Sequence, residues 1–215
     1  FIGRKVYNFF VSDTPNEVAQ DELAQAYFDS DFEIRGVLRH MFHADWFKKA
    51  AFEKVRSPAE TVATTVRLAG IFRSPREYGL MKLPGISEGM GQTLLNPPTV
   101  EGWHTGEEWI DTAGLVERVN FISEKLGNSG NPGVAMMIER ITEDRTEITV
   151  DQLLDSCLYE MGSLFLLEQT REALKDHVGG DVIFHFEQEA TRNEFNETAA
   201  ELIGLIGASR EFQLQ

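Results

Sequence analysis

The feature that most constrains the fold of this chain is the helical spacing of its apolar residues. The first ten residues place apolar side chains on one helix face: Ile2, Val6, Phe9 and Phe10. A helix start signal follows at Ser57, where Pro58 suits the first turn and Glu60 can complete a capping box. Only residues 182–186 have strand character. The pattern therefore predicts an all-α fold of about eight to ten helices.

The segment 96–110 interrupts this helical pattern. Pro98 lacks a backbone donor and restricts Pro97, so the segment forms neither a regular helix nor a central strand. Two glycines and two tryptophans follow the prolines, and a helix capped by Asp111 comes after them, with Leu115, Val119, Ile122 and Leu126 as its expected stripe. We predict an ordered Gly/Pro/Trp-rich loop, part of a loop-rich insertion at residues 73–110.

Composition and charge limit the partners that this chain can bind. At 215 residues, 42% of them hydrophobic, the length suits one helical domain over residues 1–215. The formal net charge of −15 argues against nucleic acid and anionic membrane surfaces. No apolar run approaches the roughly 20 residues that span a bilayer. The single cysteine, Cys157, excludes an intrachain disulfide, and it falls on an apolar stripe that predicts a buried, inert thiol.

Candidate binding residues lie in and just after the central loop. Trp103, His104, Glu107 and Trp109 offer two aromatic faces, an imidazole and a carboxylate. These groups can bind a sugar or a peptide, or supply a general acid. The alternative is that both indoles pack inward and lock the loop. In the next helix, Arg118 and Asn120 complete the candidate set. Arg118 either anchors a ligand or holds the scaffold through a carboxylate such as Glu107 or through loop carbonyls.

The sequence offers little support for metal or cofactor chemistry. His40 and His43 are one helical turn apart, but Arg39 lies between them and no third ligand is fixed nearby. We therefore expect no metal. The chain also has no Gly-x-Ser-x-Gly elbow and neither a phosphate loop nor a dinucleotide fingerprint, so we expect no cofactor. Whether the protein is an enzyme stays open at this point.

Several motifs together resemble the bacterial family catalogued as domain of unknown function 1800. The matching segments are residues 1–11, 43–47, 54–60, 91–98, 102–103, 109–110, 115–121 and 208–213. The resemblance implies that this chain corresponds to the C-terminal half of a longer, exported protein, periplasmic or extracellular. It brings no activity and no catalytic residues.

The start of the chain supports the expectation of a fragment. It begins with Phe1 rather than Met, and its first helix is apolar on one stripe. We expect the upstream N-terminal half of the same protein, or a partner chain, to cover Ile2, Val6, Phe9 and Phe10. The leading functional hypothesis is a non-catalytic helical half-domain that serves in assembly or binding. The alternatives are an enzyme whose site is shared between the N-terminal half and residues 96–120, and a carbohydrate-binding surface on Trp103 and Trp109.

Overall fold

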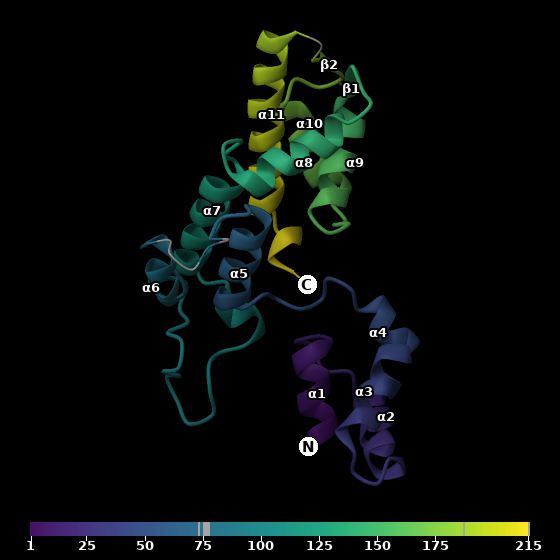
Figure 1. Cartoon of the computed structure of the whole chain (residues 1–215). Coiled ribbons are helices and arrows are strands. Elements are labelled where there is room, and N and C mark those ends of the chain that lie inside the picture. Colours follow the sequence, from purple (N-terminus) through teal and green to yellow (C-terminus); the bar gives the residue numbers. More distant parts are fainter. Residues whose placement is uncertain (73, 75–77, 187, 215) are drawn as a thin grey trace. The chain divides into compact units, whose positions relative to one another are not determined.

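The computed structural model describes residues 1–72, 74, 78–186 and 188–214. These residues form eleven α-helices and one two-stranded sheet, which confirms the predicted, mostly helical fold (Figure 1). The chain divides into two compact units, each described here by itself. Unit 1 comprises residues 1–56 and 104–108 together with Leu214, and unit 2 comprises residues 57–103 and 109–213. The expectation of one helical domain stays a prediction.

Unit 1 is a small bundle of short helices around one apolar cluster. Its helices are α1 (Ile2–Phe10), α2 (Glu17–Asp29), α3 (Ile34–His43) and α4 (Asp45–Lys49). α2 contacts both α1 and α3. Six buried side chains form the core: Tyr7, Val11, Ala19, Leu23, Val37 and Met41. Trp46 covers the cluster from α4, and its indole Nε1 donates to Glu22 at 2.8 Å.

Asp13 closes unit 1 by tying three segments together. Its carboxylate accepts from the backbone nitrogen of Val55 at 3.0 Å and from Lys54 Nζ at 3.4 Å. Gly106, with φ +65°, lies so close that a Cβ there would be 3.0 Å from the Asp13 Cβ. Val55 also forms an antiparallel bridge with Leu214. One carboxylate thus organises the junction of residues 54–55 and 104–108.

Unit 2 contains the remaining helices and the sheet. Its elements are α5 (Pro58–Leu68), η1 (Tyr78–Lys82), α6 (Leu83–Gly89), α7 (Thr112–Leu126), α8 (Pro132–Thr142), β1 (Glu147–Thr149), α9 (Val150–Glu160), α10 (Glu168–His177), β2 (Ile183–His185), α11 (Glu189–Ala208) and η3 (Glu211–Gln213). A further short helix, η2 (Gly106–Trp109), begins in unit 1 and ends in unit 2. The predicted loop-rich segment 73–110 therefore contains three short helical elements, while residues 73 and 75–77 lie outside the described residues.

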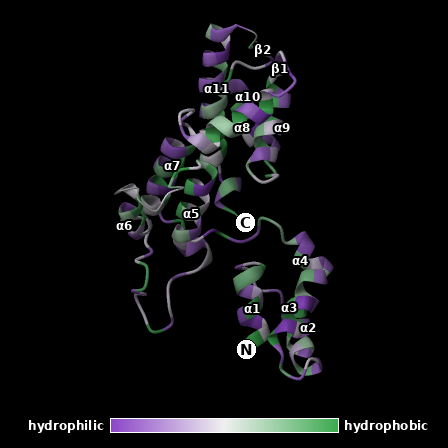
Figure 2. Cartoon of the chain, in the orientation of Figure 1, coloured by the Kyte–Doolittle hydropathy of each residue, from purple (hydrophilic) through white to green (hydrophobic). Residues whose placement is uncertain are grey.

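The core of unit 2 is organised around α11, which contacts α7, α8, α9 and α10. Hydrophilic residues dominate its N-terminal half and hydrophobic residues its C-terminal half (Figure 2). Close approach to α7 depends on glycines, because a Cβ on Gly204 would lie 2.9 Å from the Cα of Gly127. The same device joins α8 to α5: a Cβ on Gly133 would lie 2.0 Å from the carbonyl oxygen of Leu68. At both places the backbones of the neighbouring segments are in contact, and no side chain separates them.

The local signals read from the sequence are partly confirmed. Ser57 and Glu60 form the predicted capping box, and the Asp111 side chain caps α7 by accepting from Gly114 at 2.8 Å. Residues 183–185 form the predicted strand, which pairs antiparallel with β1. The β1 strand was not predicted, because it has only three residues and α9 follows at once. Within the described part of the chain, no helix is both long and apolar enough to cross a bilayer.

Candidate functional site

The two tryptophans of the central loop face different surroundings within unit 2. Trp109 is 5% exposed, whereas Trp103 is half-buried. The indole Nε1 of Trp103 donates to the carbonyl oxygen of Thr93 at 3.2 Å, across the loop. A sugar platform needs two open ring faces, and Trp109 offers none. Both rings are placed as loop anchors, while Leu95 and Val100 of the same loop are almost fully exposed.

His104 and Glu107 belong to unit 1, whereas the other four candidate residues belong to unit 2. Both side chains are exposed. The Nδ1 atom of His104 lies 3.1 Å from Oε2 of Glu108, which also accepts from the backbone nitrogen of Thr105 at 3.5 Å. These contacts stabilise the turn in which Gly106 packs against the side chain of Asp13. Within unit 1, His104 and Glu108 therefore stabilise the conformation of the predicted loop.

Arg118 is fully buried in unit 2. Its Nη1 atom donates to Thr61 Oγ1 at 2.9 Å and to Gln213 Oε1 at 3.5 Å, which connects α7 to α5 and η3. Burial lowers the pKa of Arg118 to about 10, although the charges of Glu60 and Asp111 raise it, so the guanidinium stays charged at neutral pH. A buried cation with these partners supports the scaffold and is not open to a ligand.

The predicted stripe of α7 was wrong for Leu115, which is exposed, while Val119 is only half-buried. Arg118 takes their place on the buried face, which also carries Ile122 and Leu126. The reason is that Thr61 and Gln213 accept hydrogen bonds from the guanidinium there, so a charged residue that lies beside the predicted stripe is buried. Asn120 is exposed.

His40 and His43 lie on α3 in unit 1. The Nε2 atom of His40 is 3.5 Å from Glu22 Oε2, and this carboxylate also accepts from Trp46. Within the described ranges, no three histidine, cysteine or carboxylate side chains converge in the way a metal ion requires. In unit 2, Cys157 is buried as predicted, and burial raises the pKa of its thiol, with a further rise from Glu160. This thiol is therefore protonated and unreactive at neutral pH.

An exposed surface of unit 1 carries three phenylalanines at positions whose spacing predicts apolar stripes. Phe9 and Phe10 share the stripe of Ile2 and Val6, and Phe42 falls on a second stripe with Ile34, Val37, Leu38 and Met41. Phe9, Phe10 and Phe42, here called the aromatic face, are 67%, 41% and 47% exposed. Ring centroids are 4.6 Å apart for Phe9 and Phe10 and 5.8 Å for Phe10 and Phe42. Phe42 continues the contact to the half-buried Phe47 at 5.2 Å. The face therefore joins α1 to α3 and α4 through consecutive edge-on ring contacts.

The two helices that carry the aromatic face are basic. The helices α1 and α3 contain four cationic residues and neither aspartate nor glutamate: Arg4, Lys5, Arg35 and Arg39. Lys5 precedes Phe9 by one helical turn, and Arg39 precedes Phe42 by three residues; the ammonium of Lys5 lies 5.8 Å from the centroid of the Phe1 ring. These two helices are thus basic on a chain whose formal net charge is −15.

Phe9 and Phe10, which the sequence analysis expected the upstream half or a partner chain to cover, are exposed, and the side of α1 that meets the interior of unit 1 is a different one. Gly3, Tyr7 and Val11 are buried instead. Gly3 lets α1 approach α2 closely, since a Cβ there would lie 2.9 Å from the carbonyl oxygen of Gln20.

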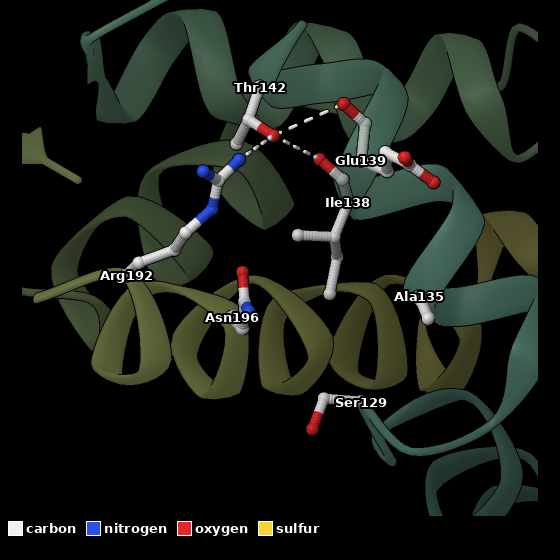
Figure 3. A pocket seen from close by; sticks show the side chains of 7 residues that line it. All are labelled: Ser129, Ala135, Ile138, Glu139, Thr142, Arg192 and Asn196. Atoms are coloured by element: carbon white, nitrogen blue, oxygen red, sulfur yellow. Dashed lines mark hydrogen bonds between the residues drawn. The ribbon is translucent and has the colours of Figure 1, made fainter. Parts of the chain in front are cut away.

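A polar cavity of about 240 Å³ lies between α8 and α11 in unit 2. Arg192 and Asn196, one turn apart on α11, both project toward α8 (Figure 3). Arg192 Nη2 donates to Thr142 Oγ1 at 3.4 Å, and that hydroxyl in turn donates to the carbonyls of Ile138 and Glu139. The cavity can hold a small polar molecule, but it has no apolar surface of the size that a drug-sized ligand needs.

The fold and these surfaces define a helical protein with an exposed aromatic face and a loop fixed by buried side chains. Over residues 1–214 the chain matches the model of the family described as Protein of unknown function (DUF1800), and it belongs to that family. Searches of curated proteins and of solved structures found no match.

Proposed function

We propose that this chain is a non-catalytic binding module of an exported protein, and that it binds an apolar, acidic helix of a partner chain through the aromatic face. The observation that carries the proposal is the exposure of three contacting phenylalanine rings on two helices that have no acidic residue. Aromatic residues and arginine are enriched at protein interfaces.

The charge of the surface selects the occupant. Lys5 and Arg39 lie on the same two helices as the rings, and within the part of the chain that the structure describes neither is paired with a carboxylate. An occupant with glutamate or aspartate on its flanks neutralises both cations, whereas a basic occupant adds like charges next to them. An amphipathic helix suits this surface, because its apolar stripe can contact the three exposed rings while its polar side reaches the cations.

A pair of synthetic helical peptides tests this proposal. Both carry the same leucine stripe, and their polar faces carry only glutamate or only lysine. Fluorescence anisotropy should show binding of the glutamate peptide that weakens with salt, as expected for contacts to exposed cations. Phe42→Ser should weaken that binding about tenfold or more, the effect of removing an aromatic anchor. Phe28→Ser removes an exposed ring outside the face and serves as the matched control.

The other occupants are outcomes of the same experiment. Equal binding of both peptides, or binding of neither, would overturn the proposal. Self-association of the protein that Phe42→Ser abolishes would assign the face to a second copy. Loss of peptide binding when the N-terminal half of the longer protein is supplied would assign it to that half. Export is a separate proposal that rests on the family resemblance, and cell fractionation that finds the protein in the cytoplasm would refute it.

A further inference from the structure

Two adjoining cavities in unit 2, distant in sequence from the aromatic face, lie beside α9. The first is a groove of about 590 Å³ along the loop between α9 and α10, where Phe165 and Leu167 are exposed. The second, of about 380 Å³, lies between α9 and the end of α8. Tyr159 and Asp155 line both, so the two cavities meet at this stretch of α9.

The groove is mainly apolar, and its aromatic walls are open. Tyr159 is 73% exposed and Phe165 71% exposed, and both line it together with leucines of the loop. Gly162 and Ser163 hold the start of this loop at φ +110° and +56°. A positive φ at a serine is uncommon, so the loop is held in this conformation by its surroundings. The groove has the size and composition typical of sites for small apolar ligands.

Charges in the second cavity are matched in all but one case. Arg140 Nε donates to Glu160 Oε2 at 2.8 Å. Arg171, which lines the groove, donates to Asp155 Oδ1 at 2.8 Å. Arg145 is different: its Nη1 donates only to the hydroxyl of Ser156, at 3.4 Å, and across the described ranges no carboxylate lies within ion-pair distance of it. The cavity therefore presents one guanidinium whose charge is not matched.

Three further acidic residues around the two cavities do not pair with Arg145 either. Glu143 and Asp144 precede Arg145 in the same turn, and neither forms an ion pair with it. Glu168 stands at the rim of the groove in the first turn of α10, where the helix dipole stabilises a negative charge. Because Arg145 has no carboxylate partner among the described residues, an anionic group can pair with it, whereas the apolar groove next to it suits a hydrocarbon or aromatic tail.

We propose that these two cavities bind a small amphipathic carboxylate, with its apolar tail over Phe165 and Leu167 and its carboxylate on Arg145. The guanidinium offers paired N–H donors that match the geometry of a carboxylate. Tyr159, on the ridge that both cavities share, covers the middle of the ligand. The site is independent of the aromatic face, because it uses other residues in the other unit.

Titration calorimetry with decanoate tests the proposal, using decanol and decylammonium as ligands with the same tail and a different head. Decanoate should bind the full chain more tightly than either. Arg145→Gln should weaken decanoate binding about tenfold and leave decanol unchanged, as expected for loss of a charged hydrogen bond. Phe165→Ser should weaken both, and Leu167→Ser gives the same test at a second exposed position.

The matched control is Arg192→Gln. Arg192 is also exposed and also donates only to a hydroxyl, at 3.4 Å, but it lines neither of the two cavities. The proposal would be overturned if Arg145→Gln and Arg192→Gln weakened decanoate binding equally, or if decylammonium bound as tightly as decanoate. It would also be overturned if decanoate and an apolar tetrapeptide with a free C-terminal carboxylate both bound with dissociation constants weaker than about 1 mM. If the tetrapeptide acid binds, while its C-terminal amide and decanoate do not, the result would support the Arg145 site and assign its ligand to a peptide C-terminus.

Discussion

Phenylalanine has opposite uses in the two units. Eight of the fifteen phenylalanines lie in residues 1–56, all of which the structure describes, and none of the eight is buried. In unit 2, Phe195 and Phe212 are among the most deeply buried side chains. A core of six modest side chains cannot enclose eight more rings. Unit 1 therefore leaves most of its rings on the surface, whereas unit 2 buries Phe195 and Phe212 in its core.

Charge divides the chain in the same way. Residues 1–56 contain eight lysines and arginines and nine acidic residues, whereas residues 57–215 contain twelve and twenty-six. Nearly all of the negative charge therefore belongs to the second region. A nearly neutral surface rich in aromatic rings is typical of an interface, and a strongly acidic surface keeps a protein soluble.

The largest expected effect is that of Phe195→Ala in unit 2. The ring is 1% exposed and lies 4.9 Å from Phe186 and 5.6 Å from Phe184, measured between centroids. Its loss should lower the free energy of unfolding by about 3–5 kcal/mol, the range for large aromatic side chains in cores. Urea denaturation measures it, and Phe28→Ala in unit 1 should cost less than about 0.5 kcal/mol. Similar costs at the two positions would break the comparison.

The units also differ in the polar groups that they bury, and Arg118 sharpens this difference. Among the described residues of unit 1 the buried polar side chain is Ser12, whereas unit 2 buries Arg118, Thr61 and Gln213 in contact. Arg118→Met should cost about 2–3 kcal/mol, because it leaves buried acceptors without their donor. The double variant with Thr61→Val should recover part of this loss. A double variant that is less stable by the full sum would show that the contact has no coupling energy.

The role of a residue in the fold was predictable where its neighbours in sequence determine that role, and not where distant residues determine it. The cap at Ser57, the cap at Asp111 and the burial of Cys157 follow from local pattern, and all three are confirmed. The burial of Arg118 was not predictable, because the partners that satisfy it are 57 and 95 residues away. Periodicity shows that a stripe is apolar, but it does not show which of two adjacent stripes meets the core.

The candidate site shows the same limit. The sequence correctly placed an ordered loop at residues 96–110, but the six residues chosen there and in α7 are divided between the two units. The aromatic face was identified only in part, through Phe9 and Phe10, because Phe42 was assigned to a buried stripe. Its exposure depends on how α3 packs against α2, which no local signal records.

Glu211 gives unit 2 a pH dependence. Burial raises its pKa, but the backbone N–H of Leu167, at 3.0 Å, and the hydroxyl of Thr170, at 2.8 Å, outweigh burial, so the net shift is downward. A lowered folded-state pKa means that the ionised form stabilises the fold above the unfolded pKa of about 4.3, and that this stability is lost as the pH falls through the folded value. As the pH falls below about 4.3, the wild type should lose more stability than Glu211→Gln, which has no carboxyl group to protonate. Parallel losses in denaturant titrations would contradict this.

The smallest expected effect on stability, and the sharpest test of the comparison, is that of Phe9→Ser. The ring is 67% exposed, and its closest ring neighbour is Phe10, itself on the surface. Its removal should change the free energy of unfolding by less than about 0.5 kcal/mol, because exposed side chains contribute little to the fold.

The same substitution should reduce the fluorescence of a bound hydrophobic dye, since the aromatic face offers the dye a contiguous apolar surface. Tyr7→Ser is the opposing control: this buried neighbour on α1 should destabilise unit 1 and increase dye binding. A loss of more than about 1 kcal/mol in Phe9→Ser, with unchanged dye binding, would mean that the ring packs within unit 1, and the contrast between surface rings in unit 1 and buried rings in unit 2 would fail.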